Sequence, residues 1–507
     1  MKNKTARDIV AEHAEFFLIL LGVCFCGMNV MATQYVVSGG AGDMSGGSWA
    51  NARADVQAAV NAASLPGEAV WVSAGRYALS APLSMRSNSM VLGGFVGTES
   101  EAEERDWDTN VTVLDGLGAT QVVRMVSITN ALLDGLVVTR GYVAATKGMG
   151  GGGILIHNAT NCVVARCKIL YNTSVRATGA TSCEGGGMLL SNTLNCVVED
   201  CLFTGNYVNP AGNSMSLLNS PGAIVNACRF VGEVQPTATG VIRVNQSGPK
   251  YFNCVASGNT VAYGGFLYGS QIQTAYNCTV CFTTNSTFGA FASYSSSIVL
   301  YNSLFAYNAR VAVCEMVDAA DLTTSNNLFH GQTEADFYDW DTTTYLTGAA
   351  AINSNTVPAK ASGNVDGDPL FVRCPTQDEG TWSAVGAYNQ DRAQTTLTDV
   401  NANFRPGALK GCFLNPDTAE TLYRHAEIAD NTANSITVWG KAEWAAAGTG
   451  YRIYDYHLRR NSPAINSGTV SGAPTVDRDG NPRPALGGID IGAYEVQVLV
   501  GTMIMAY

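Results

Sequence analysis

Cys167-Lys-Ile-Leu-Tyr-Asn172 is the stretch that decides the fold, because a similar phrase, Cys201-Leu-Phe-Thr-Gly-Asn206, follows 34 residues later. The phrase then recurs at steps of 27, 26, 24, 25 and 24 residues. Its later first positions are Cys228, Cys254, Cys278, Ser303 and Asn327. A repeat of about 20 to 50 residues is typical of solenoids and propellers.

A second mark accompanies the phrase, because a glycine usually stands 14 residues before its first position. These glycines are Gly153, Gly187, Gly240, Gly264 and Gly289, while Ser214 and Val313 interrupt the series. Two marks at a fixed separation indicate that the repeat is structural.

The segments between the marks are short and rich in β-branched residues, as in Cys162-Val-Val164 and Ile224-Val225. No run of ten or more residues in this region has apolar residues at helical spacing. Three strands of about five residues, each rising about 3.3 Å per residue, fill about 24 residues together with their turns. Each repeat therefore predicts one coil of a parallel β-helix, in which equivalent positions stack about 4.8 Å apart.

Three stacks follow from this period. The first is a cysteine ladder, with Gly135 expected at the cysteine position one period before Cys167. Beside it, an apolar stack is predicted to contain Ile169, Phe203, Phe230, Val280, Phe305 and Phe329. The third is an asparagine ladder of Asn172, Asn206, Asn259 and Asn308, which we interpret as structural because such ladders satisfy backbone groups at a turn. Buried free thiols are favoured for the cysteines, although neighbouring rungs are close enough for disulfides.

The composition describes a folded, acidic protein. The chain has 507 residues, 46% of them hydrophobic and only 14% charged, with a net charge of −12. An acidic surface excludes nucleic acid and anionic membranes as expected partners. The low charge and the 54 glycines suit a β-solenoid, which we expect to be monomeric.

Residues 1–32 are interpreted as an export signal. Lys2, Lys4 and Arg7 precede the apolar run Phe16 to Cys26, and Val30-Met-Ala32 fits a cleavage site. The residues that directly precede the cysteines of this apolar run are bulky, which disfavours a lipoprotein signal. We therefore expect a secreted or bacterial cell-surface protein without a membrane span in its mature chain, since the apolar tail 496–507 is too short to cross as a helix.

The domain organisation follows from where the period holds. Residues 33–390 are predicted to form the β-helix, with a helix from Trp49 to Ala63 capping its first coil. Residues 391–455 depart from the period and predict a small inserted β module of four strands. Residues 456–507 are predicted to form the final coil and a C-terminal cap. Residues of about 173–186 and 331–362 are expected to be loops that leave the solenoid.

Several motifs resemble a known group of proteins. They are Gly75-Arg-Tyr77, Gly93-Gly-Phe-Val-Gly-Thr-Glu99, Arg105-Asp-Trp107, and the Phe-X-X-Asn phrases at Phe203, Phe282 and Phe305. This order resembles the pectate-lyase-like and polymorphic outer membrane protein group of right-handed β-helix proteins. Near the end, Asp368-Pro-Leu-Phe371, Ser462-Pro-Ala-Ile465 and Asp477 to Glu495 resemble the choice-of-anchor Q domain. The resemblance implies a right-handed β-helix and an exported location.

For a polysaccharide lyase, the candidate residues are Arg229, Arg243 and Lys250. Such an enzyme needs a base and a group that neutralises a uronate carboxylate, which is often calcium held by carboxylates. These three cations lie on neighbouring predicted coils, but no cluster of aspartates flanks them. We therefore expect no metal or other cofactor, and only the lyase alternative leaves room for Ca²⁺.

For glycan binding, the candidate residues are Tyr338, Asp339, Trp340 and Asp341. Aromatic faces beside carboxylates suit sugars, and a glycoside hydrolase needs two carboxylates about 5 to 10 Å apart. No motif completes a catalytic set, so the sequence favours a non-catalytic, adhesin-like protein that binds an extracellular polysaccharide or surface glycan. The alternative is a polysaccharide lyase or glycoside hydrolase.

Overall fold

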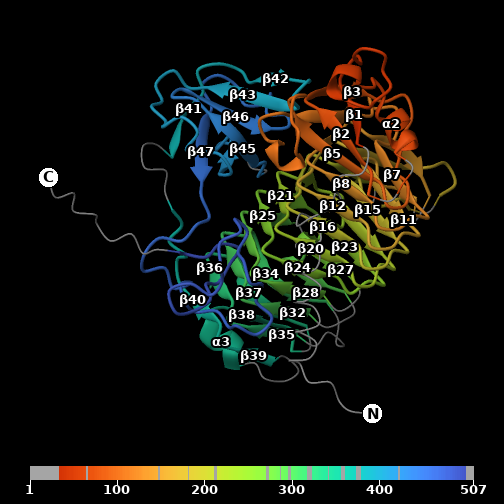
Figure 1. Ribbon diagram of the computed structural model, residues 1–507. Coiled ribbons are helices and arrows are strands. Elements are labelled where there is room, and N and C mark those ends of the chain that lie inside the picture. The colour runs from red at the N-terminus through yellow and green to blue at the C-terminus, as the bar shows by residue number, and fades with distance from the viewer. Residues whose placement is uncertain are drawn as a thin grey trace, which may run out of the picture.

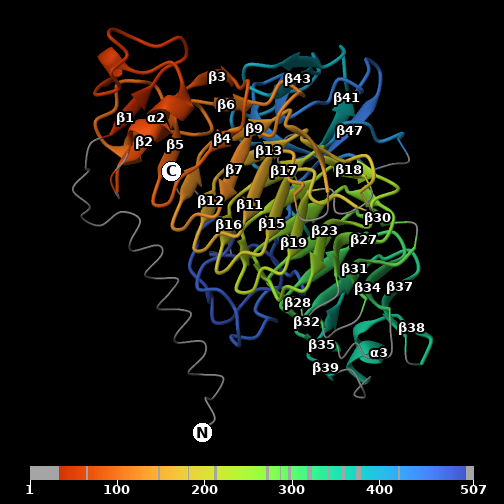
Figure 2. The same ribbon diagram turned by 90° about the vertical axis from the view of Figure 1, so that its right-hand side faces the viewer.

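The protein is a right-handed parallel β-helix, as the repeat and the resemblance predicted (Figure 1). The computed structural model describes residues 33–63, 65, 67–146, 149–180, 182–209, 214–269, 273–285, 287–294, 298–316, 322–340, 342–354, 360–372, 378–420 and 423–497. Three long sheets, named A, B and C below, run along the solenoid, and each coil contributes one strand to each of them (Figure 2). The strands pair in parallel except at the last strand of sheet C. The predicted export signal, residues 1–32, lies outside the described residues.

The strands of sheet A are β1 (Gln34–Val36), β2 (Ala69–Ser73), β5 (Met90–Phe95), β8 (Leu132–Asp134), β12 (Val163–Ala165), β16 (Val197–Glu199), β20 (Ile224–Asn226), β24 (Lys250–Phe252), β28 (Gln273–Tyr276), β32 (Ile298–Tyr301), β35 (Leu322–Ser325) and β39 (Lys360–Ser362). Those of sheet B are β3 (Gly75–Ala78), β6 (Thr112–Asp115), β9 (Val137–Thr139), β13 (Lys168–Leu170), β17 (Leu202–Thr204), β21 (Arg229–Val231), β25 (Val255–Ser257), β29 (Thr279–Cys281), β33 (Leu304–Ala306), β36 (Leu328–His330) and β40 (Val365–Asp366).

Sheet C consists of β4 (Leu83–Ser84), β7 (Val123–Val126), β11 (Ile154–His157), β15 (Met188–Ser191), β19 (Met215–Leu218), β23 (Gly240–Asn245), β27 (Gly264–Gly269), β31 (Gly289–Ser293), β34 (Val311–Glu315), β37 (Ala335–Asp339) and β38 (Thr344–Leu346). Two short sheets lie between B and C, each over three of the middle coils. They contain β10 (Tyr142–Ala145), β14 (Thr173–Arg176) and β18 (Tyr207–Asn209), and then β22 (Val234–Gln235), β26 (Thr260–Val261) and β30 (Thr284–Asn285).

The interior contains the predicted stacks. Cys167, Cys201, Cys228, Cys254 and Cys278 are buried free thiols in the ladder position. Beside them, the rings of Phe203 and Phe230 stack with centroids 4.9 Å apart, and those of Phe305 and Phe329 at 5.6 Å. One rung differs from the prediction. Because Val137 pairs with Lys168, Leu136 rather than Gly135 occupies the ladder position one coil before Cys167.

The asparagine ladder is present and it contains a carboxylate. Asn172 donates its backbone and side-chain N–H groups to Asn206 Oδ1, and Asn206 donates in the same way to Glu233. The backbone N–H of Glu233 in turn donates to Asn259 Oδ1 at 2.9 Å. Glu233 is fully buried, and burial raises its pKa to about 7. The ladder therefore contains a titratable group in its middle.

Both ends of the solenoid are covered. The predicted N-terminal helix is the 3-10 turn Trp49–Asn51 followed by α2 (Val56–Ala62), whose Val56, Ala59 and Val60 close the first end of the core. At the other end, the segment expected as a loop at 331–362 holds β37, β38 and α3 (Ala349–Ser354) instead. Ile352 of α3 packs on the core there, so this segment supplies the terminal cap. A short 3-10 turn also forms at Ala102–Glu104.

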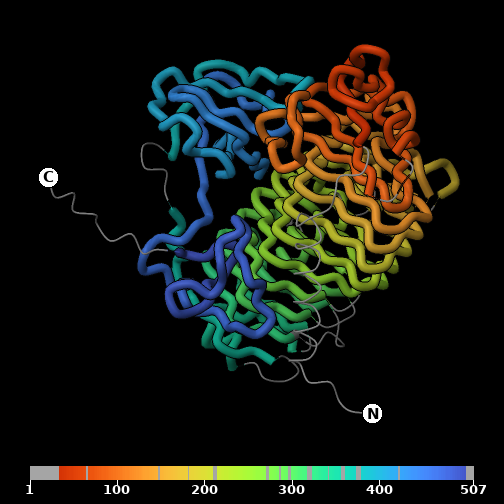
Figure 3. Tube along the Cα trace, viewed as in Figure 1, coloured from red at the N-terminus to blue at the C-terminus, as the bar shows by residue number. Residues whose placement is uncertain are grey.

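The inserted module is a seven-stranded antiparallel sheet that begins earlier than predicted. Its strands are β41 (Glu379–Thr381), β42 (Ala387–Asn389), β43 (Gln394–Thr398), β44 (Phe413–Asn415), β45 (Ala426–Asn431), β46 (Ser435–Trp439) and β47 (Gly450–Tyr454). Figure 3 shows it beside the early coils. Its Phe413 and Trp439 belong to the same apolar cluster as Leu170 and Leu202 of sheet B, so the module covers the outer face of that sheet.

Residues 456–497 do not add a coil, in contrast to the expected final coil. They run back along the corner between sheets A and B of the later coils (Figure 1). Four asparagines that occupy the same left-handed corner position hold this segment, because each side-chain amide donates to one of its carbonyls. The pairs are Asn253 with Val476, Asn277 with Asp490, Asn302 with Thr469, and Asn326 with Ser467. Residues 498–507 of the predicted cap lie outside the described residues.

Candidate functional site

The three predicted lyase cations lie on three different faces of the solenoid. Arg229 is on β21 of sheet B, Arg243 on β23 of sheet C and Lys250 on β24 of sheet A. They are neighbours along the coils, as the period indicated, but the corners between the sheets turn their side chains apart. The structure does not bring them together into one site.

Arg229 is buried under the inserted module. Its guanidinium forms ion pairs with Glu427 of β45, at 2.7 Å, and with Asp200 of the solenoid. These carboxylates raise the pKa of Arg229 against the opposing effect of burial. Arg229 therefore connects the module to sheet B and does not face solvent. Lys250 is half-buried on the outer face of sheet A, where burial lowers its pKa.

Arg243 stands on the outer face of sheet C, in a row of outward side chains. Successive strands align Ser216 with Arg243, Arg243 with Tyr268, Tyr268 with Ala292, Ala292 with Cys314 and Cys314 with Tyr338. Four strand spacings of about 4.8 Å separate Arg243 from Tyr338, so the row is about 19 Å long. This row places Arg243 and Tyr338 on one surface.

Aromatic side chains gather along this row, in two groups. In the first, the ring centroid of Tyr268 lies 5.6 Å from that of Tyr263 and 6.3 Å from that of Tyr294, and Phe288 packs 5.4 Å from Tyr263. In the second, Tyr338 lies 4.7 Å from Tyr345 and 6.1 Å from Trp340. The outermost rings, Tyr294, Trp340 and Tyr345, are 51%, 40% and 49% exposed. We call the seven residues Tyr263, Tyr268, Phe288, Tyr294, Tyr338, Trp340 and Tyr345 the aromatic face.

A buried carboxylate adjoins Arg243 at one end of the aromatic face. Arg243 Nη1 forms an ion pair with Glu184 Oε1, and Glu184 is fully buried. Glu184 Oε2 and the nearby Ser174 Oγ are buried without a hydrogen-bond partner among the described residues. A side chain at Gly150 would lie 2.9 Å from Ser174 Oγ and 1.9 Å from the Glu184 carbonyl oxygen, so only glycine leaves room here. This cluster adds acceptor groups beside the aromatic row.

Of the predicted aspartates, Asp339 does not form part of an exposed carboxylate pair. It is 2% exposed, and its Oδ1 accepts a hydrogen bond from the Thr342 backbone N–H at 3.2 Å. Asp339 therefore closes the turn between β37 and β38, while its neighbours Tyr338 and Trp340 present their rings outward. Asp341 lies outside the described residues.

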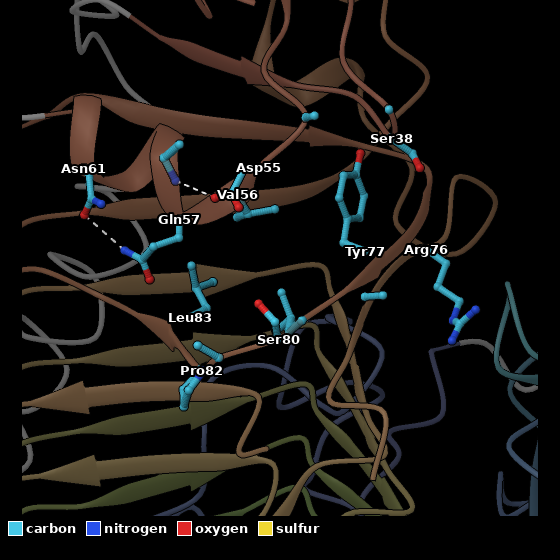
Figure 4. Close-up of a pocket in the computed structure, with 16 residues that line it drawn as sticks. Ser38, Asp55, Val56, Gln57, Asn61, Arg76, Tyr77, Ser80, Pro82 and Leu83 are labelled. Carbon is cyan, nitrogen blue, oxygen red and sulfur yellow. Dashed lines mark hydrogen bonds between the residues drawn. The ribbon is translucent and has the colours of Figure 1, made fainter. Parts of the chain in front are cut away.

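A recess of about 560 Å³ lies at the N-terminal cap, between α2 and the segment that joins β3 to β4 (Figure 4). Two of its polar side chains are bonded within the cap. Gln57 donates to Asn61 Oδ1 at 3.1 Å, and Asp55 accepts from the Ala58 backbone N–H at 2.7 Å. We assign this recess to the packing of the cap.

Two features of the described residues concern cofactors and membranes. Within these ranges, no group of three or more histidine, cysteine, aspartate or glutamate side chains is arranged to hold a metal ion. In the same part of the chain, no helix is long and apolar enough to cross a membrane.

Sequence reasoning missed Glu184 and the tyrosines of the first aromatic group. The signal available was the glycine mark at the start of each sheet C strand. The outward position lies two residues after the glycine mark at Leu189, three after it at Arg243 and four after it at Tyr268. A register shift between β23 and β27, next to Gly240, accounts for the last change. A fixed spacing from the glycine mark therefore does not identify the row of outward side chains on sheet C.

Comparison with known proteins shows a likeness in fold. No family model matches the chain, and no curated protein does so. Among solved structures, the chain is similar to the pectate lyase Pel9A, with a TM-score of 0.52, 14% identity and coverage of 92% of this chain and 97% of that one. It is more distantly similar to a rhamnogalacturonan lyase, with a TM-score of 0.32, 11% identity and coverage of 68% of this chain and 91% of that one. For the Streptococcus pneumoniae surface protein and adhesin PfbA, the TM-score is 0.31, the identity 12% and the coverage 56% of this chain and 83% of that one.

Proposed function

We propose that this protein is exported and binds an extracellular polysaccharide or surface glycan along the aromatic face of sheet C. The observation that carries the proposal is the group of exposed rings along the outer face of sheet C, with Arg243 in the same row. Aromatic rings that are half exposed offer flat apolar surfaces, and large exposed aromatic patches mark binding sites. Neighbouring strands of a parallel sheet lie about 4.8 Å apart, so the aromatic face suits an extended chain of several sugar units.

Polar groups complete this surface. Arg243 presents N–H donors, and the hydroxyl groups of Tyr268, Tyr294 and Tyr345 both donate and accept. Sugars carry an apolar face and a rim of hydroxyl groups, so rings and hydrogen-bonding groups in one row fit both parts. Tyr268, Tyr338 and Tyr345 stand on strands, and each of the other rings directly precedes or follows a strand, which fixes their spacing before the ligand binds.

Binding without turnover is the function that we favour over catalysis. Lyase chemistry needs a base within reach of the sugar and a second group that neutralises the uronate. Arg243 is already paired with Glu184, whereas Arg229 and Lys250 face other sides. One observation supports the alternative, a polysaccharide lyase or glycoside hydrolase: the unpartnered Oε2 of Glu184 is an acceptor beside the same row.

We also propose that the chain acts at the cell surface or in the secreted medium as a monomer, in an adhesin-like role. The covered ends of the solenoid support the monomer, because α2 and α3 leave neither end of the core open for end-to-end stacking. The residues that resemble choice-of-anchor Q lie in or beside the segment 456–497, which the corner asparagines hold on the solenoid. Their role in anchoring stays a prediction.

The test is to measure retention and turnover on a panel of neutral and uronate-containing glycans. We expect retention of at least one glycan without unsaturated or hydrolysed products. Trp340→Ala and Tyr268→Ala should each lower the affinity for that glycan about tenfold, a loss of about 1.4 kcal/mol of binding free energy. Tyr142→Ala, which removes an exposed tyrosine from β10 on another face, should not change retention.

Two outcomes would contradict this proposal. Retention that is unchanged in Trp340→Ala and Tyr268→Ala would exclude the aromatic face as the binding surface. Product formation that disappears in Arg243→Ala or Glu184→Gln would make the protein an enzyme, and its loss in Lys250→Ala would move the site to sheet A.

A further inference from the structure

A second recess, of about 650 Å³, lies between the inserted module and the solenoid. We call it the module groove and define it by Phe282 of the solenoid and by Glu379, Asn415, Tyr423, Arg452 and Tyr454 of the module. Phe282 directly follows β29 of sheet B, so the groove opens on a different side of the molecule from sheet C.

One wall of the module groove is aromatic. The ring centroid of Phe282 lies 4.6 Å from that of Tyr454 and 5.9 Å from that of Tyr423, which meets it edge-on at 75°. On its other side Phe282 stacks on Tyr307 at 5.1 Å. Tyr423, Tyr454 and Phe282 are all only partly buried, so their rings line the groove instead of closing it.

The rim beside this aromatic wall is polar and carries no net charge. Arg452 Nη2 and Glu379 Oε2 form an exposed ion pair at 2.6 Å between β47 and β41. This pair presents guanidinium N–H donors and carboxylate acceptors side by side, and Thr418 adds an exposed hydroxyl group. A carboxylate ligand would meet Glu379 as a like charge, whereas hydroxyl groups can bond to both partners.

We propose that the module groove binds a neutral saccharide unit, stacked on Tyr423 and Tyr454 and hydrogen-bonded at its hydroxyl groups to Glu379 and Arg452. A pocket with an apolar wall and a few convergent polar groups is the usual form of a small-ligand site. The site is independent of the aromatic face, and it gives the inserted module a function of its own.

The rim is not needed to attach the module. Attachment is provided by Arg229 with Glu427, by Ser257 with His425 at 2.8 Å, and by Tyr171 with the Lys441 backbone. Glu379 and Arg452 pair with each other, within the module. Substitutions at the rim therefore separate ligand binding from folding.

The test is calorimetric titration of the full chain with three neutral probes, cellohexaose, xylohexaose and mannohexaose. We expect at least one probe to bind, with Kd raised about tenfold or more by Tyr423→Ala and by Arg452→Met. Two controls should leave that Kd unchanged: Arg310→Met, which breaks the exposed pair with Glu334, and Trp340→Ala on the aromatic face.

The proposal is overturned if none of the three probes binds. It is also overturned if a probe binds with equal affinity to native chain, Tyr423→Ala and Arg452→Met, provided that these three proteins unfold at the same temperature. It is also overturned if only Trp340→Ala weakens binding, which would place the saccharide on sheet C. Failure of the aromatic face alone would appear as unchanged glycan retention in both Trp340→Ala and Tyr268→Ala, and it would leave the effects of Tyr423→Ala and Arg452→Met on the groove Kd intact.

Discussion

Gly258→Ala will release the inserted module from the solenoid. Gly258 has a φ of +60°, and a Cβ atom there would lie 2.2 Å from Cγ of the His425 ring. The left-handed conformation costs an alanine about 1–2 kcal/mol, and overpacking costs about 1–3 kcal/mol more. His425 is buried and bonded to Ser257 on the solenoid, so the ring cannot move without separating the two parts.

We therefore expect a loss of about 2–5 kcal/mol in the free energy of unfolding, together with new proteolytic cleavage between β41 and β47. Gly118→Ala is the matched control. Gly118 has a φ of +70°, but nothing lies within 4 Å of its Cβ position, so this variant has the backbone strain without the collision. Equal stability and equal protease resistance of the two variants would show that His425 does not hold the module in this way.

Glu233→Gln will stabilise the protein above neutral pH. Burial raises the Glu233 pKa from 4.5 to about 7, so the fold favours the neutral carboxyl group. The stability from this group is fully present below pH 4.5 and is lost as the pH rises through about 7. A difference of about 2.5 pKa units corresponds to about 3 kcal/mol at pH 8 and above.

A glutamine fits this rung without new strain, as an equivalent position shows. Gln332 stands three residues after Phe329, just as Glu233 stands three residues after Phe230. Its Oε1 accepts from the Asn308 backbone and side chain at 3.0 and 3.2 Å, and its Nε2 donates to the Phe305 carbonyl at 2.8 Å. Glutamine at 233 can accept from Asn206 in the same way and never ionises.

The measurement is the difference in unfolding free energy between Glu233→Gln and native chain from pH 4.5 to pH 8, since other carboxylates cancel in that difference. It should grow from near zero to about 3 kcal/mol. Gln332→Glu is the reciprocal variant and should become less stable than native chain as the pH rises, which is a difference of the opposite sign. A difference that stays flat with pH would contradict the raised pKa.

The solenoid itself could be predicted from the sequence because its coils repeat the same physical constraints. Cysteine fills one narrow interior position, and Asn172 or Asn206 satisfies the backbone at one corner, so each recurs with the period. Gly187 recurs because a side chain there would lie 2.9 Å from the Asn206 side chain. These stacks depend only on neighbouring coils.

Features that depend on contacts distant in the sequence could not be predicted. The segment 456–497 is held by asparagines about 140 to 220 residues earlier, and Arg229 meets Glu427 198 residues later. A repeat shows that Arg229, Arg243 and Lys250 lie on adjacent coils, but the corner turns decide which face each one joins. The pairing of Arg243 with Glu184 joins residues that are 59 positions apart, which no repeat spacing reveals.

The measurement that tests the central claim most directly is a crystal structure of the full chain with the oligosaccharide that is retained most strongly in the glycan panel. The account predicts sugar rings over Tyr268 and Tyr294 or over Trp340 and Tyr345, with a hydroxyl or carboxylate group near Arg243. A saccharide bound on the outer face of sheet A, with the aromatic face empty, would contradict it.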